Sequence, residues 1–237
     1  MGRAVLLASL VVTTACRPAA APAVRPNMLL VVIDTLRADR LGVYGNTRGL
    51  TPFLDQLAAR GTVVRRARVQ VPWTNPSVAS IFTSRYPSQH RVVDFSSMLP
   101  AAEVTLAEVL EAEGYETGAF SANGLIAESR GFAQGFDHFE AHLMVKGDDP
   151  EYLRIPRRAD RVAADLLTWL DGVRRDGPAP VPVFLYVHLM EPHSPYAPPA
   201  ERLARIRGSR PPVDLRRASE MMYGATPPLD AALLEEI

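Results

Sequence analysis

Six consecutive apolar residues, 28–33, are followed directly by an acidic side chain, Asp34. A continuous apolar run of this length, rich in β-branched residues, is typical of a strand buried on both faces, as in a parallel sheet. In open α/β sheets, ligands bind beyond the carboxyl ends of such strands. We therefore predict a buried strand at 28–33, with Asp34 placed where a cation or a substrate would bind. A simple turn-capping role for Asp34 is the alternative.

Apolar runs and helical spacings alternate along the rest of the chain. The expected elements are a strand at 28–33, a helix from 52, a strand at 62–71, helices at 78–83 and from 105, a strand at 115–120, an amphipathic helix at 159–173 and a strand at 183–189. Turns or loops are expected at 72–77, 84–90, 131–139 and 201–217. This alternation predicts an α/β fold with a mostly parallel sheet flanked by helices. Because the last residues look like the middle of an uncapped helix, we expect a chain truncated at its C-terminus.

Composition excludes some classes of function. Of the 237 residues, 26 are acidic and 26 are Lys or Arg, so overall charge gives no indication of a nucleic-acid partner. Cys16 is the single cysteine, which excludes an intrachain disulfide and a metal cluster built on cysteines.

The first 26 residues resemble an export and anchoring segment. Arg3 precedes an apolar stretch, and small residues then lead to Cys16. This outline predicts a signal peptide at 1–15, and residues 13–16 resemble the cleavage box of bacterial lipoproteins, in which the cysteine becomes acylated. Residues 16–26, rich in Pro and Ala, would be a linker off the membrane. We expect an exported lipoprotein of the cell envelope, in the periplasm or at the outer membrane, with Cys16 as the lipid anchor. A plain secretory peptide or a short anchor is the alternative.

Two further side chains are candidates for chemistry. Thr74 comes just before an expected helix, where the positive field of the helix N-terminus favours a nucleophilic oxygen or a bound oxyanion. An N-cap role is the alternative for this threonine. His193 follows the strand at 183–189 and is the better functional candidate of two nearby histidines, because His188 lies inside the strand and is expected in the core or in a supporting position.

Several segments, taken in chain order, resemble motifs of one known family. They are residues 27–45, 74–92, 114–117, 135–139 and 193–196. On these segments the chain resembles the N-terminal part of the sulfatase family, within the alkaline-phosphatase-like superfamily. The resemblance implies that residues 27–237 form an incomplete sulfatase-like N-terminal domain.

The resemblance also implies a site. It implies a divalent cation, Ca²⁺ as in sulfatases or Zn²⁺ or Mn²⁺ as in phosphate-handling relatives, with Asp34 and Thr74 as metal ligands. Thr74 stands at the nucleophile position of the family. His193 matches the substrate-contacting histidine, so the expected catalytic residues are Thr74 and His193.

The chain departs from the sulfatase pattern at four places. Thr35 replaces a second Asp, Thr74 replaces the Cys or Ser that becomes formylglycine, and Val78 replaces an Arg. Residues 121–124 replace a segment that holds the sulfate with Lys and His. A threonine should not give the same aldehyde, and phosphotransferases and phosphodiesterases of the superfamily use a threonine instead. Arg37 or Asn123 could replace the lost contacts.

Three functional hypotheses follow from these residues. The first is a metal-dependent, sulfatase-like hydrolase, tethered to the membrane, that acts on sulfate or phosphate esters; a phosphotransferase or phosphodiesterase with a threonine nucleophile is its variant. The second is a degenerate, non-catalytic module that binds anions. The third is an inactive fragment, since relatives supply further metal ligands from a segment that is not recognised here.

Overall fold

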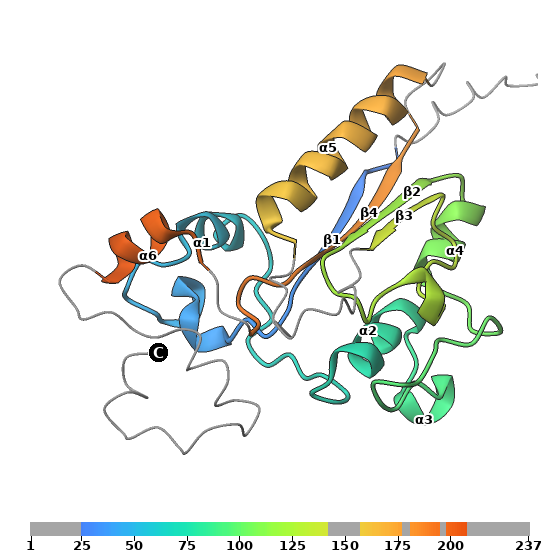
Figure 1. The fold of residues 1–237 in the computed structure, drawn as a ribbon, viewed down its shortest axis with the longest axis horizontal. Coiled ribbons are helices and arrows are strands. Elements are labelled where there is room, and N and C mark those ends of the chain that lie inside the picture. Colours follow the sequence, from blue (N-terminus) through green and yellow to red (C-terminus); the bar gives the residue numbers. More distant parts are fainter. Residues whose placement is uncertain (1–24, 142–156, 177–180, 195–197, 208–237) are drawn as a thin grey trace, which may run out of the picture.

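A four-stranded parallel sheet forms the centre of the molecule (Figure 1). The computed structural model describes residues 25–141, 157–176, 181–194 and 198–207. The strands lie in the order β1-β4-β2-β3, and every neighbouring pair is parallel. Their bounds are Met28–Ile33 for β1, Glu116–Ser121 for β2, His138–Ala141 for β3 and Val183–Leu189 for β4. The predicted α/β class with a parallel sheet is confirmed.

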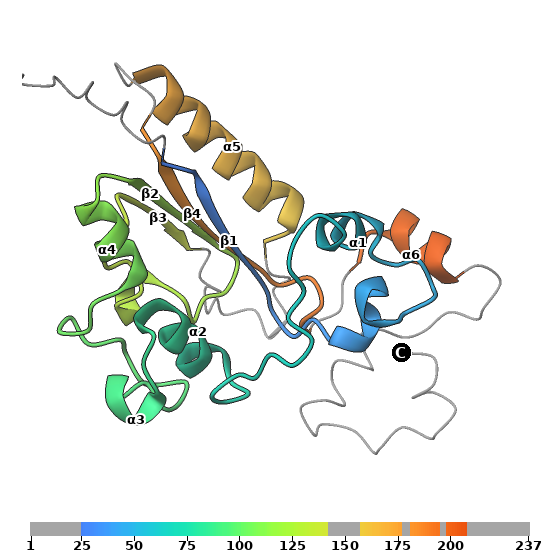
Figure 2. The ribbon, with the colours of Figure 1, turned by 180° about the vertical axis from the view of Figure 1, so that it is seen from behind.

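Helices cover both faces of this sheet (Figures 1 and 2). Helix α5 (Ala159–Asp176) packs on one face, against β2 and β4, while α2 (Thr74–Thr83) and α4 (Leu106–Ala112) lie on the other. The remaining helices are α1 (Pro52–Ala58), α3 (Pro87–His90), α6 (Ala200–Arg207) and the 3₁₀ turns Ala38–Arg40, Gly42–Tyr44 and Glu128–Arg130. Helices α1 and α6 lie to one side of the sheet.

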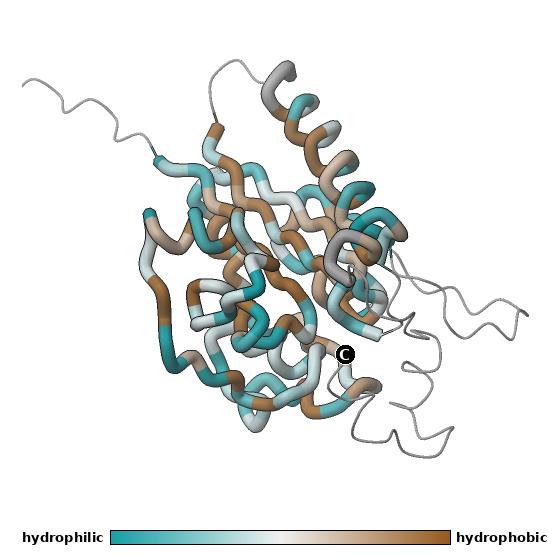
Figure 3. The backbone as a smooth tube through the Cα atoms, turned by 90° about the vertical axis from the view of Figure 1, so that its left-hand side faces the viewer, coloured by the Kyte–Doolittle hydropathy of each residue, from teal (hydrophilic) through white to brown (hydrophobic). Residues whose placement is uncertain are grey.

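The alternating side chains of β4 supply a core on each face. Tyr186 packs with Phe82 of α2, whereas Leu185 and Val187 belong to the cluster under α5. Hydrophobic segments accordingly recur along the strands and α5 in Figure 3. Trp169 lies directly over β2, where a Cβ on Gly118 would be 2.8 Å from its ring. Glycine at this position therefore lets the helix approach the sheet.

Strand β1 is not buried on both faces, so that part of the prediction is wrong. Leu30 and Val32 pack against the core on the α2 side, but Leu29 and Val31 on the opposite face are 63% and 45% exposed. Among the described strands β1 is at the edge of the sheet, and α5 packs on β2 and β4 instead. An apolar run alone does not reveal which strand a helix covers.

Other local predictions also need correction. The strand predicted at 62–71 is wrong: these residues form turns and irregular backbone, are mostly exposed, and pair with no described strand. Strand β3 lies partly inside the segment 131–139, which had been expected to be only a connection. Helix α2 starts four residues earlier than predicted, since a proline in the first helical turn lacks only an N–H that has no intrahelical partner. Helix α3 replaces part of an expected turn, and α6 begins at Ala200 and continues into the expected loop 201–217.

The N-terminal predictions lie outside the described part of the chain. This applies to the signal peptide at 1–15, to Cys16 and to most of the linker at 16–26. Residues 208–237 are likewise not described. Within the described ranges, no helix is both long enough and apolar enough to cross a bilayer.

Candidate active site

Three neighbouring strands end at the candidate site. Asp34 directly follows β1, His188 is the second-last residue of β4, and Asn123 comes two residues after β2. The Asp34 N–H donates to Leu189 O at 2.9 Å, and the N–H of Ala122 donates to His188 O at 2.9 Å. The sheet hydrogen bonding thus continues up to the functional side chains. Parallel strands place their carboxyl ends at one edge, which is where ligands bind in such sheets.

One carboxylate oxygen of Asp34 is the meeting point of the site. Its Oδ2 accepts a hydrogen bond from Asn123 Nδ2 at 2.8 Å and from Thr74 Oγ1 at 3.2 Å, and it lies 3.3 Å from His188 Nε2. We call these four residues the Asp34 cluster. Asp34 and Thr74, predicted from sequence as partners across 40 residues, are therefore within direct contact.

The surroundings keep Asp34 ionised. Burial by itself would raise the pKa of its carboxyl. The hydrogen bond from His188, the charges that His188 and His193 carry when protonated, and the hydrogen bond from Thr74 together outweigh burial, so the pKa of Asp34 lies below its ordinary value. At neutral pH, Asp34 is consequently a carboxylate able to accept the Thr74 proton.

A buried tyrosine fixes the orientation of His188. Tyr186 and His188 are both fully buried, and the Tyr186 hydroxyl lies 2.8 Å from His188 Nδ1. Burial, together with the negative charge of Asp34, raises the pKa of Tyr186 well above its ordinary value, so its phenol stays protonated. Because the phenol can then donate to Nδ1, a neutral His188 carries its own proton on Nε2 and donates it to Asp34.

Thr74 is the first residue of α2, not its N-cap. Trp73 occupies the N-cap position with extended backbone and makes no side-chain capping bond. The Thr74 hydroxyl instead turns to Asp34. At this position it lies in the positive field of the helix N-terminus, which stabilises negative charge on an oxygen.

The backbone next to Asp34 is strained. Thr35 adopts φ of 54°, a left-handed conformation that is rare for a β-branched residue. Such conformations cost about 1–3 kcal/mol and persist where the surrounding structure holds them. The strain is located directly after the residue on which the cluster converges.

His193 lies on the turn that leaves β4. Its N–H donates to Met190 O at 2.8 Å, and its positive charge in the protonated form contributes to the lowered pKa of Asp34. The structure thus brings His193 within electrostatic reach of the Asp34 cluster. Its role as a substrate contact stays a prediction, as do the roles of Thr74 and Asp34.

The prediction that His188 lies in the core or in a supporting position is confirmed, since it is fully buried and lies 3.3 Å from Asp34. Tyr186, which contacts His188 from behind, is not among the residues predicted from sequence. The alternation of side chains along β4 could have identified Tyr186, because residues two apart on a strand share a face. Of the two proposed replacements for lost contacts, Asn123 joins the cluster, whereas Arg37 forms an exposed ion pair with Asp39.

The described residues do not complete a cation site. Within the described ranges, no group of three or more His, Cys, Asp or Glu side chains could hold a metal ion. The side chain of Asn123 turns its amide N–H groups, not its oxygen, toward Asp34, since its Oδ1 accepts from the N–H of Leu125 at 2.9 Å. Calcium requires six to eight oxygen ligands and zinc about four donors. Asp34 and Thr74 supply at most part of either set.

Comparison with known proteins identifies the family of the chain. The sequence model of the Sulfatase family matches residues 26–218. The chain is 33% identical over 187 residues to arylsulfatase D of Homo sapiens, covering 71% of this chain and 31% of that protein. The chain therefore spans less than a third of the length of this relative.

Two solved structures share the fold. One is a protein in complex with its substrate D-glucosamine-2-N,6-O-disulfate, with a TM-score of 0.64 and 21% identity over 79% of this chain and 39% of that one. The other is the phosphonate monoester hydrolase of Agrobacterium radiobacter, with a TM-score of 0.60 and 23% identity over 80% of this chain and 45% of that one. Since the family match covers most of the sequence and the fold agrees, the chain belongs to the sulfatase family.

Proposed function

We propose that the intact protein hydrolyses sulfate or phosphate esters, with Thr74 as the nucleophile. The observation that carries this proposal is the 3.2 Å contact between Thr74 Oγ1 and Asp34 Oδ2 at the N-terminus of α2. Membership of the sulfatase family supports ester hydrolysis. The sulfated sugar of one structural neighbour and the phosphonate ester of another support the two classes of substrate.

The geometry suits a two-step displacement. In the first step, Thr74 Oγ forms a bond to the sulfur or phosphorus of the ester while its proton passes to Asp34. The bond to the leaving alcohol breaks, and His193 supplies the proton that this oxygen needs. In the second step, water attacks the same centre and gives a proton back to His193, the Thr74 ester breaks, sulfate or phosphate leaves, and the proton on Asp34 returns to Thr74.

The cluster supports this chemistry in two ways. The amide N–H of Asn123 and the ring of His188 hold the Asp34 carboxylate in position, so that its Oδ2 faces the Thr74 hydroxyl. The N-terminus of α2 stabilises the negative charge that develops near Thr74 during attack. Donors of this kind are worth roughly 3 kcal/mol each in other enzymes.

An assay with matched esters tests the proposal. The intact protein is incubated with an aryl sulfate, an aryl phosphate monoester and an aryl phosphodiester. Hydrolysis of at least one ester supports the proposal, and the preferred ester decides between a sulfatase and a phosphate-handling enzyme. If these esters bind saturably in the presence of Ca²⁺, Zn²⁺ or Mn²⁺ but are not hydrolysed, the result would instead favour the non-catalytic binding module.

We also propose that Asp34 and Thr74 are two ligands of a divalent cation, Ca²⁺ or alternatively Zn²⁺ or Mn²⁺. Support comes from the converging carboxylate and hydroxyl oxygens and from the general metal dependence of the family. Calorimetric titration of the intact protein with each cation should give saturable binding that Asp34→Asn weakens. Equal binding by the variant would remove Asp34 from the coordination.

The protein is further proposed to be an exported lipoprotein. The support is the sequence outline of the signal peptide at 1–15, Cys16 and the linker at 16–26. In bacterial cells, the wild-type protein should incorporate labelled fatty acid and fractionate with membranes. The Cys16→Ser variant should do neither. Labelling of that variant would exclude Cys16 as the anchor.

A further inference from the structure

A stacked pair of exposed aromatic rings lies next to Thr74. Trp73, the preceding residue, stacks on Phe95 with ring centroids 5.2 Å apart and an interplanar angle of 18°. Trp73 remains 46% exposed and Phe95 53% exposed. Large aromatic side chains dominate the energetics of cores and interfaces, so a stacked pair open to solvent is suited to contact with another molecule. We call Trp73 and Phe95 the aromatic platform.

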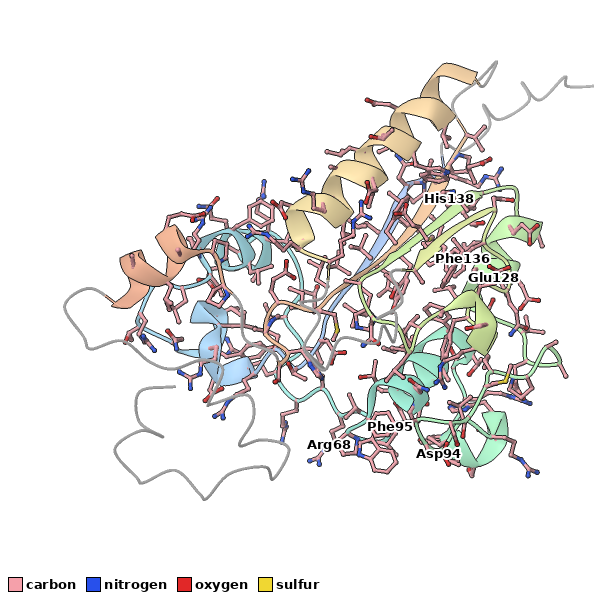
Figure 4. The ribbon with its side chains drawn as sticks, in the orientation of Figure 1. Arg68, Asp94, Phe95, Glu128, Phe136 and His138 are labelled. Atoms are coloured by element: carbon pink, nitrogen blue, oxygen red, sulfur yellow. The ribbon has the colours of Figure 1, made fainter. Side chains whose placement is uncertain are left out.

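The platform is held in place by the loop that carries Phe95. The carbonyl oxygen of Phe95 accepts a hydrogen bond from Asn75 Nδ2 at 3.3 Å and another from the guanidinium of Arg130. In the same loop, Asp94 Oδ1 accepts from the N–H and hydroxyl groups of residues 96–97 at 2.8–2.9 Å. Figure 4 shows Asp94 and Phe95 at the end of the molecule formed by α2 and α3. A surface fixed in this way needs little ordering when it binds a ligand.

The position of the platform relates it to the reacting ester. The Cα atoms of Trp73 and Thr74 are about 3.8 Å apart because the residues are consecutive. An ester that reacts at Thr74 carries its alcohol part on the far side of the ester oxygen, only a few bonds from the reacting centre. The backbone of Trp73 therefore lies beside the reacting centre, and its exposed ring borders the site on the side of Phe95.

We propose that the aromatic platform binds the ring of the ester's alcohol part by stacking. This proposal rests on the proposed function and deepens it, because it identifies the alcohol part of the ester, which is the leaving group, as a ring. The chemistry recognised is a flat ring face, which either a sugar or an aryl group offers. The carboxylate of Asp94 and the hydroxyls of residues 96–97 border Phe95 and could also contact the hydroxyls of a sugar.

The test compares esters with and without a ring in the intact protein. Ethyl sulfate lacks a ring, phenyl sulfate carries an aryl ring and glucosamine 6-sulfate carries a sugar ring; the corresponding phosphates replace them if phosphate is the preferred group. Trp73→Ala should lower kcat/KM for at least one ring ester about tenfold, mainly through KM, and leave the ethyl ester unchanged. The ring ester that loses more identifies the kind of ring.

Control variants separate stacking from folding. Trp73→Phe keeps a ring and should retain most of the activity. Phe53→Ala removes an exposed aromatic ring of α1, outside the platform, and should change nothing. Equal kcat/KM of Trp73→Ala and wild type for both ring esters would overturn the proposal, as would an equal loss for the ethyl ester.

A binding measurement separates this proposal from the proposed function. Calorimetry follows the binding of the same two ring esters to Thr74→Ala and to the double variant Thr74→Ala/Trp73→Ala. Weaker binding by the double variant supports the platform even if no ester is hydrolysed by any variant. Equal binding by both variants contradicts the platform, whatever the turnover results are.

Discussion

The inner and outer sides of the candidate site are built from different contacts. On the inner side, Asp34 is held by hydrogen bonds from three side chains, and one of these is fixed in turn by the buried Tyr186. On the outer side, Trp73 and Phe95 stack on each other but leave about half of their surface in solvent. Satisfied polar groups fix a reactive oxygen, whereas uncovered rings remain available for a ligand. Changes on the inner side should therefore affect kcat, and changes on the outer side should affect KM.

Removing the Thr74 hydroxyl should have the largest effect on the inner side. In Thr74→Ala the proposed nucleophile is gone, so kcat should fall by about 10³-fold or more, with the melting temperature almost unchanged. Thr74→Ser keeps a hydroxyl and should stay within about tenfold of wild type. Initial rates and thermal melts of both variants check this. Unchanged turnover by Thr74→Ala would remove Thr74 from the mechanism.

Neutralising Asp34 should be the next largest change. Asp34→Asn keeps the shape but loses the negative charge that accepts the Thr74 proton, and kcat should drop about 100-fold. Asp39→Asn is the matched control, because Asp39 lies in an exposed ion pair with Arg37. A comparable loss of kcat in this control would indicate a general charge effect.

Tyr186→Phe should lower kcat by less than the Asp34 variant does. The variant leaves His188 Nδ1 without its 2.8 Å partner, which should lower the free energy of unfolding by about 1–3 kcal/mol. Because His188 would then orient Asp34 less well, kcat should fall about tenfold at unchanged KM. Tyr115→Phe, at a buried tyrosine under α4, controls for the loss of a phenol. An effect of Tyr186→Phe on KM alone would contradict the positioning role.

The smallest effect is expected from loosening the outer side. Arg130→Ala removes one of the two side chains that bind the Phe95 carbonyl, and the Asn75 contact remains. KM for a ring ester should rise about twofold to threefold, with kcat unchanged. Steady-state kinetics with the ring-free ethyl ester, which should not respond, serves as the reference. If Arg130→Ala changed only kcat, the assignment of KM effects to the outer side would be contradicted.

The fold and part of the site could be predicted from local sequence. The apolar runs that became β1 and β4 and the spacing of α5 are local patterns, and the position of Asp34 after a strand follows from them. The pattern could not tell that β4 is buried on both faces whereas β1 is at the edge of the described sheet. The order of strands in a sheet depends on contacts between segments that are far apart in the chain. A short stretch of sequence contains no information about these contacts.

The same limit applies inside the site. Thr74 and His193 were recognised because each follows or begins a regular element. Tyr186 and His188 lie within an apolar strand, where polar side chains are usually assigned to the core. Their roles depend on the register of β4 beside β1, in which Val32 pairs with His188. That pairing joins residues more than 150 positions apart.

Detection of a covalent ester on Thr74 tests the central claim most directly. The intact protein is mixed with its preferred sulfate or phosphate ester, quenched in acid during turnover, digested and examined by mass spectrometry. The account predicts that the peptide containing Thr74 transiently gains the mass of one sulfo or phospho group, located on Thr74 itself. Rapid turnover with this group on another residue, or with no modified residue at any time, would contradict it.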